Sequence, residues 1–211
     1  MLSYRKLAMR VLGRPLHTGG GNDSPRPASQ RAAAFLLTAA MLTTFTAPAF
    51  AKEWDIEKGD ITVKAGEAEG PNKVKQGDND FVKDEGETII TGKSDKNTVT
   101  IEAENENDKV EVTFENVNID ASSGNKAAVS VTGKGDTNIE LNGDNELKGG
   151  DRHAGLEHNQ TVDSEGNVTS GKLTIQDDKD NAGSLTATGG DFGAGIGGGS
   201  KNAGQVTITG G

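Results

Sequence analysis

The stretch GSLTATGG at residues 183–190 returns as GQVTITGG at residues 204–211, and this repetition decides the fold class. The two copies are offset by 21 residues, and Leu173-Thr174-Ile175 precedes Ala194-Gly195-Ile196 by the same interval. A repeat of this length, with two or three short strands and glycine corners, has the size of one rung of a parallel β-helix. Such rungs stack about 4.8 Å apart, so residues 52–211 would form about seven or eight of them.

Apolar and polar residues alternate along residues 52–211, which favours strands over helices. Valine and isoleucine together outnumber leucine 22 to 5 there, and β-branched side chains suit strands. We therefore predict an all-β fold. An aligned β-sandwich and a largely disordered chain are the alternatives. The alternating pairs are Ile61/Val63, Val99/Ile101, Val129/Val131, Ile139/Leu141, Leu173/Ile175 and Val206/Ile208.

One segment indicates how the chain turns. From Val110 to Ile119 the apolar positions slip by one residue across Glu115-Asn116. A slip inside a flat strand would turn its second half inside out, whereas a corner or bulge at Asn116 keeps both halves facing inward. Hairpin signals are scarce, because Asn142-Gly143 is the only Asn-Gly or Asp-Gly pair after residue 51.

The first 51 residues differ in kind from the rest. Residues 32–51 carry no charge, follow scattered arginine and lysine, and end with small residues at Ala49 and Ala51. This pattern predicts a cleavable export signal with a long basic region and a cut before Lys52; a retained membrane anchor is the alternative. We divide the chain into a signal peptide (1–51), N-terminal β rungs with polar loops (52–109) and a glycine-rich β-helix (110–211).

Residues 52–211 are strongly acidic. The leader holds 6 of the 22 basic and 1 of the 32 acidic residues, which leaves 16 against 31 and a net charge of −15. Such a segment is poorly suited to nucleic acid or to an anionic membrane, where lysine and arginine supply the affinity. The chain has no cysteine, so disulfides, thiolate metal sites and a cysteine nucleophile are excluded.

An ordered series of motifs runs along the second half of the chain: NVNIDASS (116–123), GDNELKGG (143–150), HAGLE (153–157), KLTI (172–175), GSLTATGG (183–190), GAGIGGG (193–199) and GQVTITGG (204–211). This series resembles the repeats of large secreted Gram-positive surface proteins, whose rungs form a right-handed parallel β-helix. The resemblance implies extracellular or cell-wall placement and a structural or adhesive role, often with a carbohydrate-binding label. In that family the rungs would continue beyond Gly211, so we expect the chain to be the front part of a longer protein.

Three clusters invite a chemical interpretation. Asp151, His153, Glu157 and His158 could form a metal or acid–base group, but the two histidines should point to opposite faces of a strand, and we predict that they are surface histidines beside a turn. DDKDNAG (177–183) has Asp178, Asp180 and Gly183 at calcium-loop spacing but lacks the later ligands, so we predict a solvated turn. The third cluster is an acidic string for which we predict a loop. Its members are Glu102, Glu104, Glu106 and Asp108.

Aromatic residues that could stack on a sugar are few. We expect Phe114 in the core, because it lies in phase with Val110 and Val112. Glycan binding would then depend on outward polar ladders, for which Thr186, Thr188, Thr207 and Thr209 are candidates, although their default role is to solvate the strands. The remaining aromatic residues after the leader are Trp54, Phe81 and Phe192.

We therefore expect a secreted, non-catalytic surface or adhesin-like module with weak binding to extracellular polysaccharide. A pectate-lyase-like enzyme is the alternative, but Arg152 is the only arginine after the leader that could serve as its basic residue. We assign no catalytic, cofactor-binding or metal-binding residue. The oligomeric state stays open.

Overall fold

The computed structural model describes residues 52–67, 70–177 and 182–210. Every named element is a strand except η1, a short 3-10 turn. The elements are β1 (Lys52–Asp55), η1 (Ile56–Lys58), β2 (Ile61–Lys64), β3 (Lys73–Gln76), β4 (Val82–Lys83), β5 (Thr88–Ser94), β6 (Val99–Ala103), β7 (Lys109–Asp120), β8 (Val129–Gly133), β9 (Asp136–Lys148), β10 (Leu156–Glu157), β11 (Lys172–Asp177), β12 (Gly183–Thr188), β13 (Ile196–Gly197) and β14 (Gln205–Gly210).

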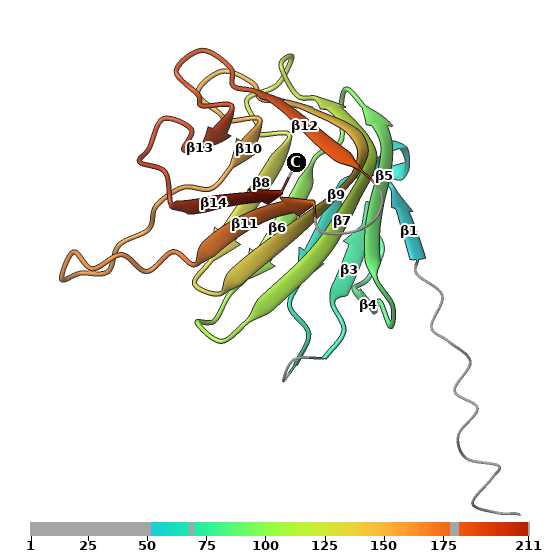
Figure 1. The fold of residues 1–211 in the computed structure, drawn as a ribbon, viewed down its shortest axis with the longest axis horizontal. Coiled ribbons are helices and arrows are strands. Elements are labelled where there is room, and N and C mark those ends of the chain that lie inside the picture. Colours follow the sequence, from blue (N-terminus) through green and yellow to red (C-terminus); the bar gives the residue numbers. More distant parts are fainter. Residues whose placement is uncertain (1–51, 68–69, 178–181, 211) are drawn as a thin grey trace, which may run out of the picture. The chain divides into compact units, whose positions relative to one another are not determined.

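The strands form two sheets (Figure 1). Sheet A has the order β1-β5-β7-β9-β11-β14, with β12 paired to the second half of β9, and all of its pairings are parallel. Sheet B has the order β13-β10-β8-β6-β2-β3-β4. Its pairings are parallel from β13 to β2. The all-β prediction is confirmed.

The chain passes repeatedly from sheet A to sheet B. It runs from β1 to β2, from β5 to β6, from β7 to β8 and from β9 to β10, and each first strand belongs to sheet A and each second to sheet B. We call one such passage a circuit. Each strand therefore pairs with the corresponding strand of the circuit before or after it, which accounts for the parallel pairing.

The predicted 21-residue period is wrong. Residues paired between parallel strands lie between 24 residues apart (Ile89 and Thr113) and 40 residues apart (Leu156 and Ile196). Leu185 pairs with Asn145, and Val206 pairs with Leu173, so the two GG-ending motifs are not neighbours. The loops between strands differ in length, and the strand pairing tolerates this because only the strands need to be in register. Sheet A stacks six strands in its described path, fewer than the predicted seven or eight rungs.

The corner predicted at Asn116 is confirmed. Asn116 has a φ of 53°, and the pairing of β7 with β9 shifts between Glu115 and Asn118. The same bend recurs at Gly92 (φ 93°) in β5 and at Gly143 (φ 63°) in β9. The Asn142-Gly143 pair thus bends a strand and does not close a hairpin.

The core lies between the two sheets and consists mainly of valine and isoleucine. Phe114 is fully buried there, as predicted. Five of the six alternating pairs are part of this core, whereas Val206 is half-buried and Ile208 is exposed on β14. Burial of these aliphatic side chains is the main force that holds the circuits together.

The N-terminal part departs from uniform parallel rungs. β2, β3 and β4 pair antiparallel, and this meander extends sheet B beyond the parallel strands. Asn72 immediately precedes β3 and Asp84 immediately follows β4, while Thr88 is the first residue of β5 in sheet A. The predicted leader, residues 1–51, lies outside the described residues.

Candidate functional site

A groove of about 650 Å³ lies on the outer face of sheet A, beside the segments that flank the antiparallel meander. Its floor is formed by β7, β9 and the end of β11, and its wall by residues 70–72 and 86–88. Nine of its 13 lining residues are polar or charged, and they include Asn72, Glu87, Lys109, Glu111, Asn138, Glu140 and Gln176.

Strand register aligns the side chains of the floor. Outward residues of β7, β9 and β11 form one row, Thr113–Glu140–Gln176, and a second row, Glu111–Asn138–Thr174. Side chains alternate across a strand, so these rows face outward while Val112, Ile139 and Ile175 between them face the core. The apolar alternation that builds the core thus also builds the polar floor of the groove.

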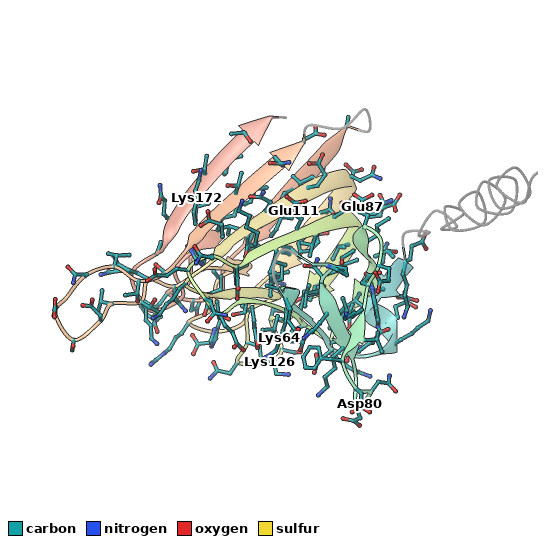
Figure 2. The ribbon with its side chains drawn as sticks, turned by 90° about the horizontal axis from the view of Figure 1, so that it is seen from below. Lys64, Asp80, Glu87, Glu111, Lys126 and Lys172 are labelled. Atoms are coloured by element: carbon teal, nitrogen blue, oxygen red, sulfur yellow. The ribbon has the colours of Figure 1, made fainter. Side chains whose placement is uncertain are left out.

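Hydrogen bonds hold the carboxylates of the groove in place. The Thr113 hydroxyl donates to Glu87 Oε1 at 2.6 Å, and Gln176 Nε2 donates to Glu140 Oε2 at 3.0 Å. Glu140 is only 6% exposed, whereas Glu87 and Glu111 are exposed (Figure 2). A carboxylate fixed in this way is a pre-positioned acceptor for ligand hydroxyl groups.

The wall is anchored to the core. Asn72 Nδ2 donates to the Thr88 hydroxyl (3.0 Å) and to the Glu111 carbonyl (2.7 Å), which ties the wall to the floor. Asp84 N donates to the Asn72 carbonyl, and Trp54 Nε1 donates to Asp84 Oδ2, both at 2.8 Å. Trp54 is therefore buried and structural, and it offers no face to a sugar.

The charge in the groove is unbalanced. Three glutamates face one lysine, Lys109, among the lining residues, so an anionic ligand would meet net repulsion. The amides of Asn138 and Gln176 add donors as well as acceptors. The arrangement suits a polar ligand rich in hydroxyl groups, whether neutral or positively charged.

The cluster around Asp151 does not assemble as a single site, and one part of its prediction is wrong. His158 is 2% exposed, with Nδ1 3.3 Å from the Val131 carbonyl and Nε2 2.9 Å from the Gly171 carbonyl, so it is a core residue and not a surface one. His153 Nδ1 lies 2.9 Å from Glu157 Oε2 instead. Asp151 pairs with Arg152 at 3.6 Å.

Glu157 serves as a structural clamp. Its carboxylate accepts from Ala154 N (3.1 Å) and from Asn159 Nδ2 (2.6 Å), in addition to the contact with His153. Asn159 Oδ1 accepts in turn from Gly199 N at 3.0 Å. Every oxygen of this carboxylate thus has a local partner, which accounts for its burial.

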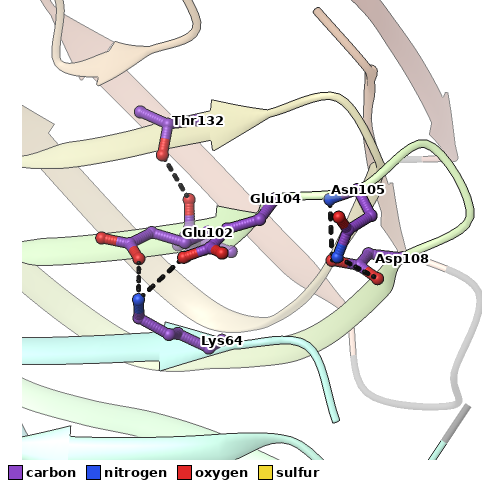
Figure 3. Close-up of polar contacts among 7 residues, drawn as sticks. Lys64, Glu102, Glu104, Asn105, Asp108 and Thr132 are labelled. Carbon is purple, nitrogen blue, oxygen red and sulfur yellow. Dashed lines mark hydrogen bonds and ion pairs between the residues drawn. The ribbon is translucent and has the colours of Figure 1, made fainter. Parts of the chain in front are cut away.

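The acidic string is only partly a loop (Figure 3). Glu102 lies in β6, and Lys64 Nζ reaches it at 2.7 Å and Glu104 at 2.9 Å. Hydrogen bonds to Glu102 and then Glu104 raise the pKa of Lys64. Asp108 closes a turn by accepting from Asn105 N at 2.9 Å. Glu102, Glu104 and Asp108 thus each have a local partner, which explains why these like charges are tolerated there.

The candidate sugar contacts are divided among different surfaces. Phe81 is 39% exposed and Phe192 is 85% exposed. Thr207 and Thr209 lie on β14 beside Thr174 and Gln176, whereas Thr186 and Thr188 lie on β12 beside Glu146 and Lys148. The four threonines therefore do not form one ladder.

Within residues 52–67, 70–177 and 182–210, no group of three or more histidine, aspartate or glutamate side chains is arranged to hold a metal ion. Asp178 and Asp180 of the predicted solvated turn lie outside those residues. The same described part of the chain contains no helix of the length and apolar character needed to cross a bilayer.

No motif in the sequence marks the residues that line the groove as a site. Glu111, Asn138, Glu140 and Gln176 occupy the polar positions between alternating apolar residues, and that pattern was visible. What brings them together is the pairing of β7 with β9 and of β9 with β11, across 27 and 36 residues. No local signal in the sequence specifies those two distances.

Comparison of the chain with protein-family models, with curated proteins and with solved structures finds no match. The resemblance to Gram-positive surface repeats stays a prediction.

Proposed function

We propose that the protein is an exported, non-catalytic extracellular module with the fold of a right-handed parallel β-helix, and that it binds polysaccharide weakly through the groove. Two features support the fold assignment: the alternation of the chain between two parallel sheets, and the recurring bend at Gly92, Asn116 and Gly143. The composition of residues 1–51 supports export. A surface or adhesive role follows from these features together.

The observation that carries the binding proposal is the polar groove across neighbouring circuits. An extended polysaccharide can cross several strands of the floor and meet a row of acceptors and donors about every 4.8 Å. Each hydrogen bond contributes little net free energy, so the affinity of one site is expected to be low. Its excess of carboxylates favours neutral glycans over polyuronates.

A polysaccharide-degrading enzyme is the second candidate, because Glu87 and Glu140 both line the groove, and Thr113, which donates to Glu87, is paired with Glu140. Lyases of this class act on polyuronates and use a basic residue to accept a proton. Arg152 does not line the groove, and Lys109 faces three carboxylates. We therefore favour binding without catalysis.

Calorimetric titration of the purified protein tests the proposal. We expect binding of a neutral oligosaccharide such as cellohexaose, no binding of polygalacturonate, and no release of unsaturated or reducing ends. Asn138→Ala should weaken cellohexaose binding about threefold to tenfold, because one floor hydrogen bond is lost. Thr100→Ala, an outward position of β6, is the matched control. Cleavage of polygalacturonate would overturn the proposal in favour of the enzyme.

A further inference from the structure

Two turns of the chain repeat each other one circuit apart. The segment GGDRHAGLE (149–157) is identical to GGDFGAGIG (189–197) at five of nine positions with a spacing of 40 residues. The structure pairs Leu156 with Ile196 at the same spacing. The turns stack directly, because Arg152 N donates to the Asp191 carbonyl at 2.7 Å.

Both turns place a large side chain where glycine is favoured. His153 N donates to the Gly150 carbonyl (3.0 Å), and Gly193 N donates to the Gly190 carbonyl (2.9 Å), so each is a four-residue turn. The third residue has a φ of 62° at Arg152 and 63° at Phe192. A turn with positive φ at this position normally carries glycine or asparagine, because other side chains strain the backbone.

Both strained side chains face solvent. Phe192 is 85% exposed, more than any other large apolar side chain described, and the Arg152 side chain is 67% exposed. The turn of Arg152 is covered on one side by the turn of Phe192, and on the other Gly150 N donates to the Lys126 carbonyl. The Arg152 side chain stays exposed although its turn lies between the turn of Phe192 and the segment that contains Lys126. A side chain at this turn position therefore points away from the stacked turns.

Neither side chain is needed to form its turn. The closing hydrogen bonds join backbone atoms, and the ion pair of Arg152 is a long contact of 3.6 Å with the adjacent Asp151. Residues with strained backbone conformations cluster at ligand-contact and other functional sites, so two such residues with exposed side chains motivate a functional hypothesis. Glycine at either position would relieve the strain but would remove the exposed group.

We propose that Phe192 and Arg152 form a second sugar-contact site, in which the C–H face of a neutral pyranose ring packs on the Phe192 ring and Arg152 donates hydrogen bonds to its hydroxyl groups. This inference rests on the proposed polysaccharide binding but concerns a different surface, because neither residue lines the groove. An aromatic face and the planar donor array of a guanidinium are complementary to the two kinds of surface that a sugar ring presents.

The test combines affinity and stability of the purified full chain. Phe192→Gly and Arg152→Gly should each weaken cellohexaose binding about threefold to tenfold. Each should also raise the thermal unfolding midpoint by about 2–4 °C, because the left-handed position is relieved of strain. A purely structural role would predict a lower midpoint. Phe81→Ala is the matched control, since it removes an exposed aromatic residue outside the two turns.

Four results would overturn the inference. If Phe192→Gly lowers the midpoint, the ring is structural. If Phe192→Gly leaves the affinity for cellohexaose unchanged while Asn138→Ala weakens that affinity, the second sugar-contact site is wrong and binding in the groove is supported. If the wild-type chain binds no cellohexaose, both proposals fail. If Phe192→Gly abolishes self-association seen by sedimentation, the exposed ring contacts a second copy of the chain and not a sugar.

Discussion

The corner at Asn116 and the turn at Arg152 both hold a non-glycine residue with positive φ, but they use its side chain differently. Asn116 Oδ1 accepts from Asp144 N at 3.2 Å, so its side chain links one circuit to the next. The side chains of Arg152 and Phe192 project into solvent instead. Equal backbone strain therefore has a structural reason at the corner and, in our proposal, a ligand-binding reason at the turns.

The corner also has an internal support that the turns lack. Asn145 is buried inside the bend, where its Oδ1 accepts from Val117 N at 2.9 Å. Its Nδ2 lies 3.1 Å from the Ser184 carbonyl, and it also contacts the Asn142 and Gly143 carbonyls. One side chain therefore connects β7, β9 and β12.

The largest effect is expected from removing this support. Asn145→Ala should lower the free energy of unfolding by about 2–4 kcal/mol, because it leaves buried backbone groups without partners. Chemical denaturation measures the change. Asn118→Ala, which removes an exposed hydrogen bond to Glu146, should cost less than about 0.5 kcal/mol. Equal losses in the two variants would contradict the role assigned to the corner.

Substitutions at Asn116 and Arg152 test whether these two left-handed positions differ in their effect on stability. Asn116→Ala should destabilise the protein by about 1–2 kcal/mol, because alanine disfavours positive φ and cannot accept from Asp144 N. Asn116→Gly should cost less, since only the hydrogen bond is lost. At Arg152, alanine should be nearly neutral and glycine stabilising. Thermal unfolding measures these changes, and a stabilising Asn116→Gly or a destabilising Arg152→Gly would remove the distinction.

The smallest effect concerns a third turn, which precedes that of Arg152 by one circuit. Hydrogen bonds from the Ser122 hydroxyl and from Ser122 N lower the pKa of Asp120, and Lys148 adds to this at 3.3 Å. A depressed folded-state pKa stabilises the protein above the pKa of the unfolded chain, and this contribution is lost as the pH falls through the folded-state value.

Asp120→Asn tests this contribution. The variant should unfold at a slightly lower temperature than the wild type near neutral pH, and the two midpoints should converge in acid. The difference should be small because the carboxylate is about half exposed. A constant difference from neutral to acid pH would mean that the charge of Asp120 does not matter.

Much of the fold could be predicted from local patterns. The alternation at Val110 to Phe114 and at Leu173 to Ile175 placed these residues in strands, and the phase slip located the bend at Asn116. The period could not be read from the two GG-ending motifs, because similar strand sequences occur in strands that are not paired. The 40-residue match between segments 149–157 and 189–197 was present in the sequence and corresponds to an actual pairing.

The candidate site was less predictable than the fold. The burial of His158 depends on the carbonyls of Val131 and Gly171, which approach it only after the circuits stack. The groove likewise needs Asn72 from the antiparallel meander to reach the Glu111 carbonyl of β7. Contacts between residues 39 apart leave no periodic trace in the sequence.

By itself the sequence determined which residues face inward, because a strand alternates its faces with a period of two and water drives the apolar face inward. It also determined where the backbone could bend, because few residues tolerate positive φ. Only the tertiary structure decided which strands became neighbours, and hence which carboxylates share the groove. Strand pairing follows from the stacking of whole circuits. The loops of these circuits vary in length without changing the apolar alternation within each strand, so the alternation does not specify which strands pair.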